Sequence, residues 1–200
     1  MILDALLQIK GYEVAGIIDI KENLETKVFG VSVIGTDADL PHFLKSGIRH
    51  CFISVGSVGN PHLRIKLFNL AKKMGFVFPN LISLAAKVSA NVILGEGNYI
   101  APGVIINAGT QIGDNCIINT GVIIEHDCKI GNFVHLSPGS ILSGGVLVEN
   151  YTHIGTGSVV IQDLVIGEDV IVGVGSVVTK NIRKELVAYG NPCKERKDNV

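Results

Sequence analysis

A single aliphatic residue recurs at every sixth position over about half of the chain, and this period restricts the fold more than any other feature. From Ile82 to Val178, each sixth residue is Ile, Leu or Val, which makes seventeen consecutive matches without an insertion. A period of six does not fit an α-helix, but it is even and therefore compatible with extended chain, whose side chains alternate between two sides. Each hexad predicts one short strand followed by a turn.

Three hexads are expected to close one triangular coil, and the stretch is long enough for about five coils. Aliphatic residues eighteen positions apart should then stack, as in the series Leu94, Ile112, Ile130, Val148 and Ile166. Several glycines directly follow a stacked aliphatic residue, and we expect them to form the corners with positive φ, which glycine adopts without strain. These glycines are Gly95, Gly113, Gly131, Gly155, Gly167 and Gly173.

Composition and charge exclude several classes of function. The hydrophobic fraction of 47% is ample for a core, and the formal net charge of -1 argues against a nucleic-acid partner. We find no apolar run of membrane-spanning length and no signal peptide, so no membrane partner is expected. The four cysteines lack metal-type spacing, which favours reduced thiols and a cytoplasmic location.

The residues before the hexads alternate between predicted helices and strands, which indicates a small parallel α/β domain. The pattern predicts helices at 2–10, 36–45 and 61–74, strands at 13–19 and 49–55, and a glycine-bearing loop at 56–60. We therefore expect three parts, namely an α/β domain at 1–79, a β-helix at 80–180 and a tail at 181–200.

Four segments together resemble the hexapeptide-repeat sugar acetyltransferases, nearest the sialic-acid O-acetyltransferase-like group that includes the N-acetyltransferase of the bacillosamine pathway. They are GYEVAGIID, FISVGSVGNPHLRIKL, the hexads and GNPCK. The resemblance implies a left-handed parallel β-helix, a homotrimer, acetyl-CoA as cosubstrate, and a Rossmann-like N-terminal domain that holds a nucleotide sugar. Such relatives begin with a strand and a G-x-G-G-H-G-like loop, which this sequence lacks, so the first strand of the domain is expected to be missing.

The segment 119–144 contains the residues best suited to acyl transfer, which needs a base for the acceptor proton and donors for the oxyanion. His126 is the candidate base, and Asp127 beside it is suited to hold its tautomer. The segment Glu125 to Cys128 matches an E-H-[DE]-C pattern, and the resemblance implies these same roles. Cys128 occupies a small-residue position of the hexad, so packing is favoured over a role as nucleophile.

Further site residues are implied by the resemblance alone. They are His135, Thr156 and Val174 for the cofactor, and Asp19, Gly56 and Gly144 for the substrate. His153 lies eighteen residues after His135, so the two should stack on adjacent coils, and we expect His153 to be a solvated corner residue. Six basic residues after Thr179 are either a solvated tail or contacts to cofactor phosphates.

The sequence therefore predicts an acetyl-CoA-dependent acetyltransferase that acts on the amino group of a nucleotide-linked amino-deoxysugar for surface-glycan synthesis. Acetylation of a sugar hydroxyl and an inactive trimer that only binds or assembles are the alternatives. A β-helix without catalysis, such as a scaffold protein, is less favoured. A zinc carbonic anhydrase on the same fold is disfavoured because the histidine spacings of nine and eighteen differ from its close pair, so no metal is expected.

Overall fold

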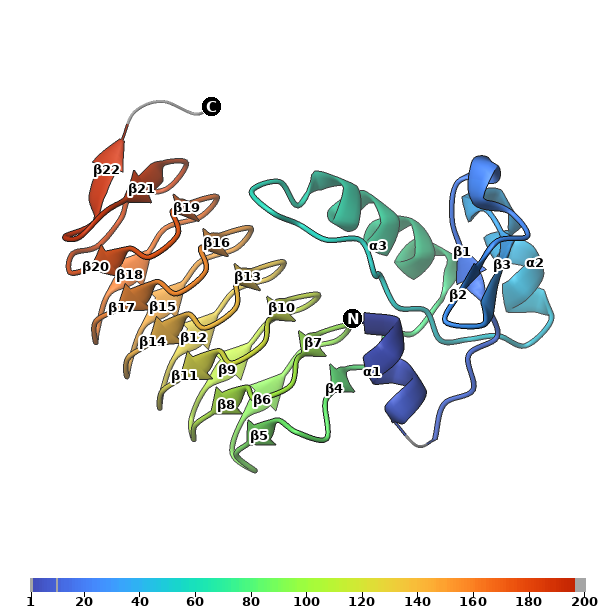
Figure 1. Cartoon of the computed structure of the whole chain (residues 1–200), viewed down its shortest axis with the longest axis horizontal. Coiled ribbons are helices and arrows are strands. Elements are labelled where there is room, and N and C mark those ends of the chain that lie inside the picture. The colour runs from blue at the N-terminus through green and yellow to red at the C-terminus, as the bar shows by residue number, and fades with distance from the viewer. Residues whose placement is uncertain (1, 10, 197–200) are drawn as a thin grey trace.

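The computed structural model describes residues 2–9 and 11–196 and contains an N-terminal part and a stack of very short parallel strands (Figure 1). Among the described residues, no helix combines the length and apolar character needed to cross a membrane.

The stack is a parallel β-helix of seventeen two-residue strands. The strands are β4 (Leu81–Ile82), β5 (Lys87–Val88), β6 (Ile93–Leu94), β7 (Tyr99–Ile100), β8 (Ile105–Ile106), β9 (Gln111–Ile112), β10 (Ile117–Ile118), β11 (Ile123–Ile124), β12 (Lys129–Ile130), β13 (His135–Leu136), β14 (Ile141–Leu142), β15 (Leu147–Val148), β16 (His153–Ile154), β17 (Val159–Val160), β18 (Val165–Ile166), β19 (Ile171–Val172) and β20 (Val177–Val178). Each strand ends on one of the aliphatic residues of the six-residue period, so the predicted strand in every hexad is confirmed.

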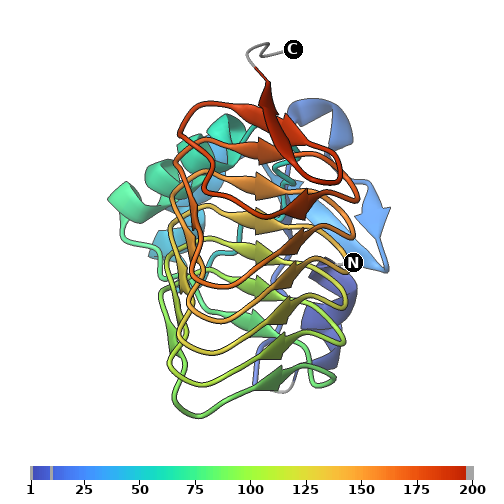
Figure 2. The same ribbon diagram turned by 90° about the vertical axis from the view of Figure 1, so that its left-hand side faces the viewer.

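The strands form three parallel sheets that make the sides of a triangular prism (Figure 2). Face 1 has the order β19-β16-β13-β10-β7-β4, face 2 the order β20-β17-β14-β11-β8-β5, and face 3 the order β18-β15-β12-β9-β6. Pairing joins residues eighteen apart, for example Leu94 with Ile112 and Ile130 with Val148, as predicted. From Ile100 onward each stacked aliphatic is at most 4% exposed, so these residues form the core.

The glycines at the corners differ from the prediction. Positive φ recurs every six residues from 97 to 175, three positions after each stacked aliphatic, and it is carried by Gly, Asn, Asp and two aromatic residues. Gly155 and the other glycines that directly follow the aliphatic residue do not have positive φ. There, a Cβ atom would meet the next coil, at 2.6 Å from the carbonyl oxygen of Val172 in the case of Gly155. The prediction of positive φ was wrong, and close approach between coils is the physical reason for glycine.

The N-terminal part contains three short strands and several helices. Its elements are α1 (Ile2–Gln8), β1 (Ile17–Ile18), η1 (Lys21–Asn23), β2 (Lys27–Val28), β3 (Val31–Gly35), η2 (Asp37–Asp39), α2 (Leu40–Lys45) and α3 (His62–Met74). β3 lies between β1, which is parallel to it, and β2, which is antiparallel. Among the described residues, no strand precedes β1.

The strand predicted at 49–55 is wrong. Only a single parallel bridge joins His50 to Val77. The guanidinium of Arg64 explains the difference, because its Nη1 donates to the carbonyl oxygens of Ile53 at 2.6 Å and Val55 at 2.8 Å. These backbone acceptors are therefore satisfied by a side chain instead of a neighbouring strand.

The N-terminal part packs against face 1 and the adjoining corner of the β-helix. Arg64 Nε donates to the carbonyl oxygen of Asn115 at 3.2 Å, and the Phe68 ring of α3 contacts the Phe133 ring at a centroid distance of 5.4 Å. The outward-facing Tyr99 side chain of face 1 is completely buried as a result. At the other end of the stack, β21 (Val187–Tyr189) pairs with β19 and with β22 (Lys194–Arg196).

Glycines at positions of close approach and glycines with positive φ predict different losses of unfolding free energy when they are replaced by alanine. Gly155→Ala places Cβ within 2.7 Å of three backbone atoms of the next coil, and backbone cannot rotate away as a side chain can, so we expect a loss of roughly 3 kcal/mol or more of unfolding free energy. Gly139→Ala meets no atom within 4 Å and incurs only the left-handed backbone cost of about 1 to 2 kcal/mol. Chemical denaturation of the two variants measures the difference. Equal losses would contradict the assignment of Gly155 to close approach.

Candidate active site

The corners of the β-helix form three rows of residues spaced by eighteen positions. The first corner row follows face 1 and contains Pro102, Thr120, Pro138, Thr156 and Val174. The second corner row follows face 2 and contains Ala108, His126, Gly144 and Gln162. The third corner row follows face 3, next to α3, and contains Glu96, Asp114, Asn132, Asn150 and Glu168.

His126 of the second corner row pairs with Asp127, the residue that follows it in the chain. His126 Nδ1 lies 2.9 Å from Asp127 Oδ2, and both side chains are mostly exposed, at 67% and 72%. Asp127 occupies the left-handed corner position, with φ of 60°, which Asp tolerates better than most residues. This bond holds Nδ1 against the carboxylate, so Nε2 of the same ring is left as the proton acceptor.

The charge around His126 favours its protonated form. The hydrogen bond that His126 donates to the Asp127 carboxylate raises the pKa of His126 above the ordinary value of 6.5, with smaller contributions from the charges of Asp127, Glu125 and Asp163. Glu125 is itself held in place, because Asn107 Nδ2 donates to its Oε2 at 2.8 Å. An imidazole whose pKa is raised by a neighbouring carboxylate, such as His126 beside Asp127, is suited to remove a proton near neutral pH.

Gly144 lies on the next coil, directly against the His126 ring. A Cβ atom at Gly144 would lie 2.7 Å from both Cε1 and Nε2 of His126. The neighbouring Gly145 N–H donates to the His126 carbonyl oxygen at 2.9 Å, which fixes the spacing of the two coils. Within residues 2–9 and 11–196, the Gly144 N–H makes no hydrogen bond, so it remains a donor beside the imidazole.

His135 and His153 lie elsewhere, on face 1 beneath the N-terminal part. The two residues pair on adjacent coils, as predicted, and their rings meet edge to face at a centroid distance of 4.8 Å. The prediction that His153 is solvated was wrong, because its side chain is only 9% exposed. Burial lowers the pKa of His135 to about 4, with a further contribution from His153, so this pair is neutral near pH 7.

The Cys128 thiol is buried and its Sγ donates to the Ser143 carbonyl oxygen at 3.2 Å. Burial raises the pKa of this thiol to about 11, so it is protonated near pH 7. A protonated thiol is a poor nucleophile, and packing is the role that the structure supports.

The other predicted site residues are divided between the two parts of the chain. Thr156 and Val174 are exposed neighbours in the first corner row, where the Gly175 N–H donates to the Thr156 carbonyl oxygen at 2.9 Å. Asp19 follows β1 and accepts hydrogen bonds from the Ile20 N–H and from Asn23, and Gly56 lies in an exposed position before α3. Within one chain, β1 lies far from β11, the strand that precedes His126 (Figure 1).

The basic residues of the tail are partly engaged with the protein itself. Arg183 pairs with Glu195 through Nη2 at 2.7 Å, and Arg196 lies over the Tyr189 ring at 5.1 Å. Lys180 and Lys194 are exposed, and Lys197 lies outside the described residues. Lys184 is also exposed and its Nζ lies 3.5 Å from Glu185 Oε1, so contact with cofactor phosphates is an interpretation for Lys180 and Lys194.

Arg64 was missed in the sequence analysis, although a signal for it exists. It shares the buried side of α3 with Phe68 and Ala71, at the three- and four-residue spacings that mark the core-facing stripe of a helix. A charged residue in such a stripe indicates a buried polar contact.

Three comparisons with known proteins bear on this site. The family model for bacterial transferase hexapeptide (six repeats) matches residues 109–144, which include His126, Asp127 and Gly144. None of the curated protein sequences compared with the chain matches it. Solved structures do match, and they cover nearly the whole chain.

PerB from Caulobacter crescentus, crystallised with CoA and GDP-perosamine, is 39% identical, with a TM-score of 0.91 over 98% of this chain and 91% of its own. A mutant of perosamine N-acetyltransferase from the same organism, with a histidine replaced by asparagine, is 38% identical with a TM-score of 0.90 over the same shares of 98% and 91%. The acetyltransferase domain of PglB from Neisseria gonorrhoeae, in complex with acetyl coenzyme A, is 30% identical with a TM-score of 0.82, again over 98% and 91%. These matches confirm the left-handed parallel β-helix.

The His126 and Asp127 pair predicts a measurable titration. We expect the imidazole of His126 to titrate above 6.5, and Asp127→Asn to bring its pKa down toward 6.5, because the amide removes the charge that favours imidazolium. Asn is the matched substitution, since it also tolerates the left-handed corner. NMR titration of the imidazole protons measures both values. Identical values in the two proteins would contradict the electrostatic role of Asp127.

Proposed function

The chain belongs to the bacterial hexapeptide-repeat acetyltransferases, and from this membership we propose that it transfers the acetyl group of acetyl-CoA to the amino group of a nucleotide-linked amino-deoxysugar. The single observation that carries the proposal is the pair of His126 and Asp127 directly against Gly144. His126 supplies the base, Asp127 the acid that orients it, and the Gly144 N–H a backbone donor, all at one corner.

In the proposed reaction, His126 Nε2 accepts the proton of the sugar amine as its nitrogen attacks the thioester carbonyl carbon. The Gly144 N–H is placed to stabilise the oxyanion of the tetrahedral intermediate, and Asp127 stabilises the imidazolium. The C–S bond then breaks, and the proton passes to the leaving sulfur. The products are the N-acetylated sugar and CoA.

The substrates are assigned to the two parts of the chain. We place the nucleotide sugar on the α/β domain at 1–79, with Asp19 and Gly56 as contacts, and acetyl-CoA on the β-helix domain at 80–180, with Thr156 and Val174 as contacts. His135 is not included, because its side chain is buried beneath the N-terminal part. The structural relatives support this pair of ligands, because PerB was crystallised with CoA and GDP-perosamine. Both the free cysteines and the use of acetyl-CoA favour the cytoplasm as the location.

We further propose that the active site is shared between subunits of a homotrimer. Within one chain, β1, which precedes Asp19, lies far from β11, which precedes His126 (Figure 1). Face 2 also presents outward-facing aliphatic side chains, which a second subunit would bury. These side chains are Ile105, Ile123, Ile141, Val159 and Val177. A neighbouring subunit that packs near this face would bring its own N-terminal part toward His126.

The proposed reaction predicts the effect of removing the base. With acetyl-CoA and GDP-, UDP- or dTDP-linked 4-amino-4,6-dideoxy sugars, we expect thiol release with one of these acceptors and a fall in kcat of roughly 10² to 10⁴ for His126→Ala. His42→Ala, on the exposed side of α2, is the control and should leave turnover unchanged. Acceptors with a 4-hydroxyl group test sugar O-acetylation in parallel. Turnover of none of the amino sugars would contradict the proposal.

The trimer predicts a change of mass on substitution of face 2. Wild type should have about three times the 21.2 kDa mass of one chain by light scattering after gel filtration. Ile123→Asp introduces a charge into the proposed interface and should give monomers with unchanged circular dichroism. Phe29→Asp is the control, because Phe29 is 68% exposed in the β2–β3 turn. A monomeric wild type, or a trimeric Ile123→Asp variant, would contradict this arrangement.

A further inference from the structure

The carboxylate of Asp127 leans over the corner of the preceding coil, where Gly109 lies eighteen positions earlier in the sequence. Gly109 is exposed and has φ of 78°. A Cβ atom built on Gly109 would overlap Asp127 Oδ1 and would lie only 3.2 Å from its Cγ. The carboxylate therefore occupies the volume that a side chain at position 109 would need.

The two oxygen atoms of this carboxylate have different surroundings. Oδ2 lies 2.9 Å from His126 Nδ1 and orients the imidazole. Within residues 2–9 and 11–196, Oδ1 accepts no hydrogen bond, so no donor holds that side of the group. The two backbones cannot separate easily, because the Asp127 N–H donates to the Ala108 carbonyl oxygen at 3.0 Å. The empty space at Gly109 is therefore what allows the carboxylate to reach the imidazole from this position.

The same arrangement occurs two coils later without a histidine. Asp163 also has positive φ, at 58°, and a Cβ atom on Gly145 would overlap its Oδ1. The residue before Asp163 is Gln162. An aspartate that leans over a glycine is thus a property of this corner, and it does not require a pair with an imidazole. For Asp127, this means that the carboxylate has its direction before any substrate binds.

We propose that Gly109 is a positioning residue for the transfer reaction, because its lack of a side chain leaves room for the Asp127 carboxylate, which in turn orients the His126 ring. This inference rests on the proposed function. A side chain at position 109 would turn the carboxylate away, since a side chain moves more readily than two hydrogen-bonded backbones. The imidazole would then lose its acceptor at Nδ1, and Nε2 would no longer be fixed as the base.

The test compares Gly109→Ala with Gly103→Ala, one hexad earlier, where the backbone is closely matched. Gly103 has φ of 74°, and its N–H donates to the Ala85 carbonyl oxygen at 3.2 Å, as the Gly109 N–H donates to that of Asn91 at 3.3 Å. A Cβ atom on Gly103 has no neighbour closer than 3.7 Å. Both alanines incur the left-handed backbone cost, but only the one at position 109 meets a carboxylate.

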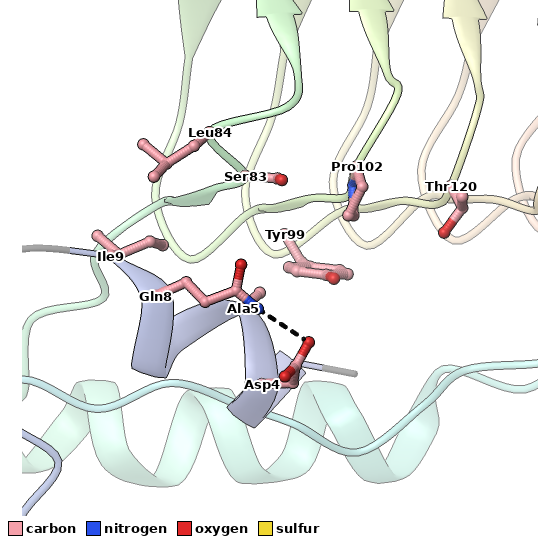
Figure 3. A pocket seen from close by; sticks show the side chains of 9 residues that line it. All are labelled: Asp4, Ala5, Gln8, Ile9, Ser83, Leu84, Tyr99, Pro102 and Thr120. Atoms are coloured by element: carbon pink, nitrogen blue, oxygen red, sulfur yellow. Dashed lines mark hydrogen bonds between the residues drawn. The ribbon is translucent and has the colours of Figure 1, made fainter.

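The control position also lies apart from the proposed base. Pro102, the residue before Gly103, lines a cavity of about 90 Å³ beside α1, together with Tyr99 (Figure 3). Neither His126 nor Asp127 lines this cavity. Gly103→Ala therefore measures the backbone cost alone.

We expect kcat for the amino sugar to fall roughly 10- to 100-fold in Gly109→Ala, with both KM values unchanged, and to stay at the wild-type value in Gly103→Ala. By NMR titration, the pKa of His126 should move toward 6.5 in Gly109→Ala alone, because the hydrogen bond to Asp127 is the largest cause of its raised value. In an Asp127→Gly background, Gly109→Ala should have no further effect on kcat, since the carboxylate is absent. A purely structural role of Gly109 would not give this dependence on Asp127.

The outcomes separate this inference from the proposed function. If wild type acetylates the amino sugar and Gly109→Ala keeps the wild-type kcat and the wild-type pKa of His126, the positioning role is wrong and the proposed function stands. If Gly109→Ala does not fold, adding Asp127→Gly should relieve the overlap and restore the stability of Gly103→Ala, and a double variant that also does not fold would overturn the inference. If wild type turns over no amino sugar, the proposed function fails and the positioning role fails with it.

Discussion

The hydrogen-bonded stacking of coils, with a repeat of eighteen residues, is the constraint on which the rest of the structure depends. It places each residue directly above its counterpart on the next coil, so neighbouring backbones approach too closely for a side chain at positions such as Gly155. The same register places Gly144 against the His126 ring and stacks His135 on His153. The geometry of the candidate site is therefore a direct result of the repeat, since residues far apart in sequence meet only because they share a corner row.

The six-residue period predicted the strands, the core and the vertical pairs, because all three depend only on which residues are aliphatic and how far apart they are. It did not separate two kinds of glycine, since the close-approach glycines and the positions of positive φ lie only two residues apart within a hexad. Asp127 and Asn115 carry the positive φ at some corners, which further hides that requirement in the sequence. The burial of His153 was missed for a related reason: the hexad is the same on all three faces and does not show which face the N-terminal part covers.

Arg64 shows how a tertiary contact overrides a local pattern. The segment before Gly56 has the composition of a strand, yet its carbonyl oxygens at Ile53 and Val55 bond to a guanidinium from α3. The same side chain reaches Asn115 on the β-helix, so one buried cation ties the loop, the helix and the coil together. Burial lowers the pKa of Arg64 to about 10, which still leaves it charged near pH 7. Its charge is solvated by main-chain dipoles instead of by an acid, and no pattern of local propensity contains that information.

The exposure of His126 is informative about the proposed mechanism. In one chain the imidazole is open to water, and the hydrogen bond to Asp127 is the largest influence on its pKa. Enclosure by substrate and a neighbouring subunit would remove water and disfavour the imidazolium. Asp127 opposes that change, so enclosure lowers the pKa of the proposed base less than it would without the acid. A histidine that is enclosed without an acid, such as His135, instead has its pKa lowered to about 4. The contrast between these two histidines supports the assignment of proton transfer to His126.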